Sequence, residues 1–185
     1  LEGLTITVND GTININASDD GINAAGGTDS SGFGGFGHDA FSADSDVNIY
    51  INGGTITINA DGDGIDSNGY LYVTGGGIYV SGPESSADCA LDYNGEATIT
   101  GGTLIAAGAS GMAENFGSDS TQGSILVSFT TQSAGTTISL LDESGSTLLS
   151  WQSDKTYSSV VISSPDIVVG NTYTIKAGDY ETTVT

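Results

Sequence analysis

The stretch INGGTITINADGDGIDSNG, residues 51–69, sets a pattern that recurs along the chain. A glycine-containing turn comes first, apolar residues then alternate with polar ones, and an acidic turn follows. The same plan occurs at residues 8–24 and 73–95 and, without the acidic turn, at 99–115. Once an insertion at about residues 25–46 is set aside, the repeats lie roughly 22 to 26 residues apart, which indicates a stacked repeat protein.

This repeat is too short for a strand and a full helix, and its β-branched residues alternate with polar ones as in strands. We therefore expect an all-β fold, a parallel β-helix in which each repeat forms one coil and stacked coils share a core. Gly53, Gly75 and Gly101 are expected to take positive φ at the coil corners. Alignment of the repeats predicts four inward-facing columns: Val8, Ile51, Val73 and Ile99; Ile13, Ile56, Ile78 and Leu104; Ile15, Ile58, Val80 and Ala106; Ile22, Ile65, Leu91 and Met112.

The repeats end near residue 123, where the composition changes. We expect residues 1–123 to form the β-helix with its insertion, and residues 124–185 to form a small C-terminal β cap region or small β domain. Segments such as SSVVIS (158–163) and TYTIKA (172–177), separated by turn signals, predict strands in this part. The pattern leaves open whether these strands extend the helix or form an antiparallel domain.

Charge limits the possible partners. The chain has 23 acidic residues against 2 basic ones, Lys155 and Lys176, and a formal net charge of −21. Direct contact with nucleic acid or with an anionic membrane surface needs cationic side chains, so neither is expected. No apolar run reaches the ~18 residues of a membrane span, so membrane insertion is not expected either. The alternating Ile and Val residues argue against disorder, so the carboxylates must be neutralised in another way.

Carboxylates recur with the coils in SDDGIN (18–23), DGDGID (61–66) and ADCALD (87–92). Unit charges at the strand spacing of about 4.8 Å repel by roughly 3–4 kcal/mol at an effective dielectric near 20. Raised pKa values, a solvated acidic edge and bound cations are the alternatives, and stacked oxygen ligands favour calcium. The spacing fits neither an EF-hand nor a nonapeptide calcium β-roll, and one Cys with one His does not predict a zinc site. The expected columns are Asn23, Asp66 and Asp92; Asp20, Asp63 and Cys89; and the flanking Asp19 and Asp88.

The DGIN and DGID motifs, followed by NGG and TGG turns, resemble those of the bacterial cell-surface carbohydrate-binding β-helix family related to polysaccharide lyase family 9. The resemblance covers about residues 4–130. It implies a right-handed helix, coil-bound calcium, and binding of pectin-like or cellulose-like polymers without cleavage, by an extracellular protein that is secreted or attached to the bacterial surface. The residues that match the family's calcium motif are Asp19, Asp20, Asp63, Asp66 and Asp92, with Asp88 a weaker match because Cys89 stands beside it.

Outward-facing tyrosines are the candidate ligand contacts. Strand alternation places Tyr50 and Tyr72 in one column, with Tyr70 on the same face and Tyr79 on the neighbouring strand. Flat aromatic rings on a rigid face suit sugar rings. Packing of the rings against each other across strands is the structural alternative.

The sequence predicts a binding protein and no enzyme. A lyase needs a base that reaches its substrate, yet both lysines lie in the C-terminal part, and His38 is expected to be an exposed residue of the insertion. Cys89 has no activating base near it in sequence, so it is expected to be a small buried hydrophobe. The predicted function is calcium-dependent binding of a polysaccharide, either a uronate polymer bridged through calcium or a β-glucan. A structural or adhesive cell-surface module that binds a protein partner is the alternative.

Overall fold

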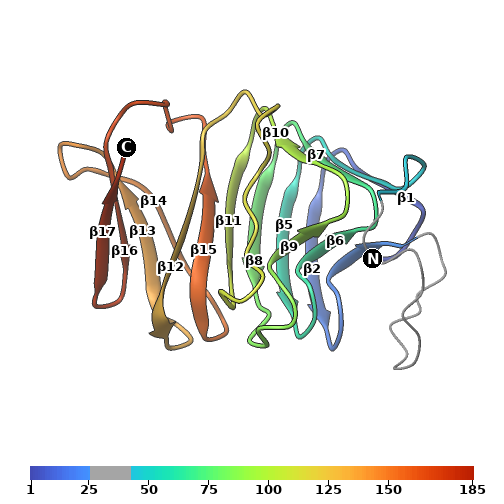
Figure 1. Ribbon diagram of the computed structural model, residues 1–185, viewed down its shortest axis with the longest axis horizontal. Helices are drawn as coiled ribbons and strands as arrows, with labels where there is room; N and C mark the ends of the chain where they lie inside the picture. Colours follow the sequence, from blue (N-terminus) through green and yellow to red (C-terminus); the bar gives the residue numbers. More distant parts are fainter. Residues whose placement is uncertain (26–42) are drawn as a thin grey trace.

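The computed structural model describes residues 1–25 and 43–185, and every regular element within them is a β-strand. Figure 1 shows the strands as successive layers, from the N-terminus at one end of the molecule to an antiparallel sheet at the other. The predicted all-β fold is confirmed. In the described part of the chain, no helix is long and apolar enough to span a membrane.

Three stacks of parallel strands are built from the repeats. Each repeat, here called a coil, gives its first strand to one sheet, its second to another and its third to a third, so equivalent residues of successive coils are neighbours. The first sheet contains β1 (Thr5–Val8), β4 (Asn48–Ile51), β7 (Tyr70–Val73) and β10 (Ala97–Ile99). The second contains β2 (Thr12–Ala17), β5 (Thr55–Ala60), β8 (Gly77–Ser81) and β11 (Thr103–Gly108). The third contains β3 (Ile22–Ala24), β6 (Ile65–Ser67) and β9 (Leu91–Tyr93).

The register confirms the predicted inward columns on the first two strands of each coil. Val8 pairs with Ile51, Ile51 with Val73, and Val73 with Ile99. Both second-strand columns are also in register, and their members from the second coil onward have at most 1% of their surface exposed. Ile13 and Ile15 are only partly buried, because β2 is the edge strand of its sheet.

The prediction that Met112 completes the third column was wrong. Ile22, Ile65 and Leu91 pair in register, whereas Met112 is 48% exposed. After β11 the chain adds no strand beside β9 and instead runs along β10, where the N–H groups of Gly117 and Gln122 donate to the carbonyls of Ala97 and Ile99. Phe116 supplies the buried apolar side chain in this segment.

Both glycines of the coil corner are needed, but the predicted assignment of positive φ was wrong by one residue. Positive φ occurs at the second glycine, for example 85° at Gly54 and 91° at Gly76. At the first glycine the constraint is space: a Cβ on Gly53, Gly75 or Gly101 would lie 2.5 Å from a carbonyl oxygen of the preceding coil. The corner therefore combines a left-handed turn with close backbone stacking.

The C-terminal residues do both things that the sequence left open. β15 (Tyr157–Ser163) pairs antiparallel with β11, and β12 (Ser124–Gln132) pairs with β15, so these two strands extend the second sheet. A separate antiparallel sheet follows, in the order β14 (Thr147–Gln152), β13 (Thr137–Leu141), β16 (Tyr173–Ala177) and β17 (Tyr180–Val184). A second apolar core contains residues of both sheets and is distinct from the core inside the coils.

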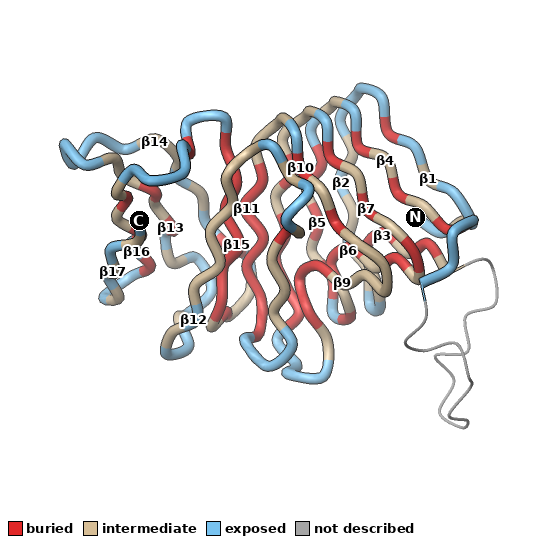
Figure 2. Tube along the Cα trace, turned by 45° about the horizontal axis from the view of Figure 1, so that its top comes forward, coloured by how far each residue is buried: buried red, intermediate tan, exposed pale blue. Residues whose placement is uncertain are grey.

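Successive residues of β11 serve these two cores. Leu104 and Ala106 belong to the core inside the coils, and Ile105 and Ala107 belong to the second core. Figure 2 shows the resulting run of buried positions along β11 and β15. A strand that is buried on both faces is apolar throughout, which explains why TLIAAG in β11 lacks the outward polar residues of TININA in β2.

The turn between β14 and β15 fastens the C-terminal part to the coils. Thr156 donates through its N–H and its hydroxyl to Glu84, and Lys155 Nζ donates to the carbonyl of Ala60 at 2.6 Å and pairs with Asp61. The Lys155 side chain is only 12% exposed, whereas the Lys176–Glu181 pair lies on the surface. Lys155 therefore neutralises a coil carboxylate, although it follows that residue by 94 positions.

We expect Lys155→Met to lower the free energy of unfolding by about 1–2 kcal/mol, because a partly buried carbonyl and a carboxylate lose their donor. Lys176→Met is the matched control and should change it by less than about 0.5 kcal/mol, as is usual for an exposed pair. Urea unfolding of the two variants measures the difference. Equal effects would contradict the anchoring role of Lys155.

Candidate metal centre

The acidic turns that join the second and third strands of the coils lie one above another. On the third strands, Asn23 pairs with Asp66, and Asp66 pairs with Asp92, as predicted. Because side chains alternate across a strand, these residues face away from the core that Ile65 and Leu91 fill. All three polar residues are nonetheless partly buried.

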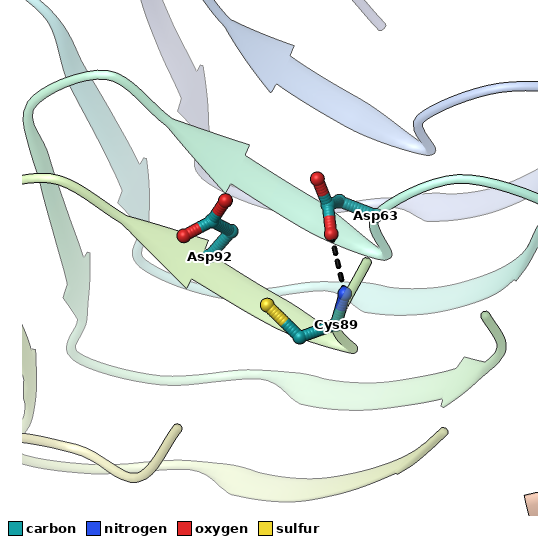
Figure 3. A group of neighbouring side chains, drawn as sticks. All are labelled: Asp63, Cys89 and Asp92. Carbon is teal, nitrogen blue, oxygen red and sulfur yellow. Dashed lines mark hydrogen bonds between the residues drawn. The ribbon is translucent and has the colours of Figure 1, made fainter. Parts of the chain in front are cut away.

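Hydrogen bonds link the preceding column, Asp20, Asp63 and Cys89, from coil to coil. The N–H of Asp63 donates to Asp20 Oδ1 at 2.8 Å, and the N–H of Cys89 donates to Asp63 Oδ1 at 2.6 Å. The second of these bonds is drawn in Figure 3. Each carboxylate is therefore held in place by the backbone of the equivalent residue in the next coil.

Two groups of side chains bring their potential metal-ligating atoms within 4.8 Å of one another. We call Asp20, Asp63 and Asp66 the oxygen group, and Asp63, Cys89 and Asp92 the thiol group. Asp63 belongs to both. Figure 3 shows the thiol group, with the sulfur of Cys89 directed to the side on which the two carboxylates lie.

The other two predicted metal ligands, Asp19 and Asp88, belong to neither group. Asp19 is exposed, and the equivalent position in the next coil is Gly62, whose N–H donates to the carbonyl of Asp19. Asp88 is close enough to help raise the pKa of Asp63 and of Asp92, so it contributes charge to the site. The ladder thus converges on four of the six predicted aspartates.

Burial makes the shared carboxylate hard to ionise. Removal from water raises the pKa of Asp63 to about 7, with a further rise from three neighbouring aspartates and an opposing effect from the N–H of Cys89. Burial also raises the pKa of Asp92 and, above its ordinary value, that of the Cys89 thiol. Near neutral pH the site therefore either keeps a proton or exchanges it for a cation.

Asn23 contacts the oxygen group through its side-chain amide. Its Nδ2 donates to Asp20 Oδ2 at 2.8 Å. Its Oδ1 is buried and has no hydrogen-bond partner among the described residues. An orphaned buried acceptor costs free energy unless it finds a donor or a cation.

Sequence reasoning missed the contribution of two residues. Cys89 is buried as predicted, with 1% of its surface exposed, but it lies outside the apolar core cluster and among the carboxylates. Glu114 has a pKa raised first by burial and then by the charge of Asp92. Alignment could not place Glu114, because the chain leaves the repeat after β11. His38, predicted as an exposed loop residue, lies outside the described residues.

Three of the four predicted tyrosines form one stack on the outer face of the first sheet. The ring centroids of Tyr50 and Tyr72 lie 5.1 Å apart and those of Tyr70 and Tyr72 lie 6.1 Å apart, with planes within 16° of parallel. We call these residues the tyrosine stack; all three remain partly exposed. Tyr79 lies apart from them, because its ring packs against Trp151 at the second core.

We expect the metal-free protein to lose stability as the pH rises through about 7. The pKa of Asp63 is raised from 3.8 to about 7 in the folded state, so its contribution is complete below the lower value and disappears as the carboxyl group ionises. Asp63→Asn should remove on the order of 2 kcal/mol of this pH dependence, after allowance for the water that still reaches the group.

Urea unfolding in a chelating buffer at several pH values measures this slope. Asp179→Asn changes an exposed carboxylate in the turn between β16 and β17 and should leave the slope as it is. An unchanged slope in Asp63→Asn would show that another group carries the dependence.

Three comparisons give no relative for this chain: no protein-family model matches it, and neither does a curated protein or a solved structure. The expected relation to the carbohydrate-binding β-helix family therefore stays a prediction.

Proposed function

We propose that this chain is a calcium-dependent, non-catalytic polysaccharide-binding module built on a right-handed parallel β-helix. The observation that carries the proposal is the oxygen group, in which three partly buried carboxylates lie within 4.8 Å of one another in the coil ladder. Both lysines are engaged elsewhere, since Lys155 pairs with Asp61 and Lys176 with Glu181. A divalent cation would remove the repulsion that stacking imposes.

Calcium suits the donors of this group better than other common ions do. Asp20, Asp63 and Asp66 supply carboxylate oxygens, and Asn23 Oδ1 is a buried oxygen in need of a partner. Calcium takes six to eight oxygen ligands in flexible geometry, so carbonyls and water can complete the set. For the proposed secreted or bacterial cell-surface location, the expected affinity is that of extracellular calcium modules, a Kd of about 10⁻⁴ to 10⁻³ M.

An acidic polymer would reach this protein through the metal. The chain carries a formal net charge of −21, so a uronate polymer is repelled unless a cation lies between the two. Calcium held by the oxygen group would keep coordination positions for carboxylates of the polymer. The resemblance to the carbohydrate-binding β-helix family is the reason for preferring a pectin-like polymer as the ligand.

The tyrosine stack is the proposed contact for sugar rings, including those of a neutral β-glucan. It lies close to the metal ladder, because only Asn68 and Gly69 separate β6 from β7. Ser67 stiffens this corner: its hydroxyl accepts the N–H of Gly69 at 3.2 Å and donates to the carbonyl of Tyr70 at 3.1 Å. A polymer lying across the corner would meet Asp66 on one side and Tyr70 on the other.

Binding without cleavage is proposed because the ionisable groups that could act as a base are engaged in ion pairs, hydrogen bonds or the proposed metal site. A lyase needs a base that reaches the substrate, and both lysines are already paired with carboxylates. The ladder carboxylates accept backbone N–H groups or crowd one another, which suits metal binding better than proton abstraction. Neither the lysines nor the ladder carboxylates are therefore placed to act as a general base.

We expect calcium to bind with a Kd of about 10⁻⁴ to 10⁻³ M, and polygalacturonate beads to retain the protein only with calcium. Asp66→Asn should weaken calcium binding by at least about tenfold, while the exposed Asp179→Asn should not. Isothermal titration and a bead pull-down measure both effects. Retention in excess chelator, with elemental analysis showing that the metal is gone, would refute calcium bridging.

We expect Tyr72→Ala, which removes the middle ring of the tyrosine stack, to weaken β-glucan binding by about tenfold. The calcium affinity should not change, because the stack and the oxygen group lie on different sheets. Tyr79→Ala is the control, since that ring packs against Trp151 and its loss should lower stability only. Affinity electrophoresis of the folded variants separates the outcomes, and equal glucan binding by all of them would exclude the stack as a sugar contact.

A further inference from the structure

We propose that the thiol group, Asp63, Cys89 and Asp92, is a second metal site that selects a thiophilic divalent cation of the zinc class. Because Asp63 also belongs to the oxygen group, an ion in this site competes with calcium in the other. The competition rests on the proposed function, whereas the thiophilic site itself does not.

The position of Cys89 in the ladder separates it from a cysteine that merely fills the core. It follows Asp20 and Asp63 in the column that is hydrogen-bonded from coil to coil, so the third coil presents sulfur where the first two present carboxylates. The residue is only 1% exposed, yet it is not part of the apolar core cluster. Figure 3 shows the buried sulfur directed to the side of the two carboxylates.

The distances allow one ion to reach all three ligands. Zinc bonds thiolate sulfur at about 2.3 Å and carboxylate oxygen at about 2.1 Å, so two ligands at a tetrahedral angle lie roughly 3.6 Å apart. The potential ligand atoms of the thiol group already lie within 4.8 Å of one another. Side-chain adjustments of about 1 Å would close the site, and the fourth position would be left for water.

The donor chemistry distinguishes the thiol group from the oxygen group. Calcium is a hard cation that is held by oxygen, whereas thiolate favours zinc and softer ions. One residue of the repeat, Cys89 in place of an aspartate, is therefore the specificity-determining change. Binding involves no redox step: the thiol proton passes to solvent as the metal–sulfur bond forms.

Asp63 couples the two sites. Its carboxylate is the common member of both groups, and its Oδ1 is fixed by the N–H of Cys89. A cation bound by Cys89 and Asp92 would also coordinate the Asp63 carboxylate, so this carboxylate would be less available to calcium. Occupancy of the thiol group should therefore weaken calcium binding without blocking the oxygen group itself.

Spectroscopy of the unaltered protein tests the site directly. The chain has a single cysteine, so thiolate-to-metal charge-transfer absorption on titration with cadmium can come only from Cys89. We expect this absorption to saturate at one ion per chain, and zinc to displace cadmium. Absence of the absorption at saturating cadmium would overturn the proposal, whatever the behaviour of any variant.

Calorimetry tests selectivity and coupling. Cys89→Ser should weaken zinc binding by at least about 100-fold, because it removes the thiolate ligand. Zinc should weaken calcium binding in the unaltered protein and not in Cys89→Ser. Zinc binding that is the same in both proteins would overturn the proposal. Zinc binding through Cys89 with no calcium binding at all would refute the proposed function and leave the thiophilic site standing.

Discussion

In-register pairing of equivalent strands is the constraint on which the rest of the structure depends. It sets each residue beside its equivalent in the next coil, at the strand spacing of about 4.8 Å, and it does so for apolar and acidic residues alike. Ile51 and Val73 thereby join a continuous core, and Asp66 is brought beside Asp92 by the same ladder. The coils cannot form one column without the other, so the carboxylates have to be accommodated by backbone donors, by retained protons or by cations.

Features that repeat could be predicted from the sequence, because stacking converts a period in the chain into a column in space. The core columns and the Asn23–Asp66–Asp92 row follow from this rule. The rule fails at Met112, because the fourth coil is followed by the C-terminal part and its chain turns along β10 instead of forming a third strand. The repeat also does not predict whether the Cys89 side chain faces the apolar core or the carboxylates, since a thiol can be buried in either place.

The C-terminal part was harder to predict, because its contacts are made by residues far apart in sequence. One signal was present: the outward positions of β11, Ile105 and Ala107, are apolar where those of β2 are polar. A second sheet must cover such a face. No comparable signal marks Lys155, which reaches its partner Asp61 in the coils only when the turn between β14 and β15 is docked.

That docking divides the acidic residues of the coils into two classes. Asp61 is exposed enough to be reached by a lysine from outside the stack. Asp63, two residues later, lies within the ladder, where its Oδ1 accepts the N–H of Cys89 and burial raises its pKa to about 7. A lysine side chain can neutralise a carboxylate of the first class, whereas only a proton or a small cation can neutralise one of the second. Removing Lys155 should therefore affect the attachment of the C-terminal part, and changing Asp63 should affect protons and metals, so the two substitutions test separate parts of one charge balance.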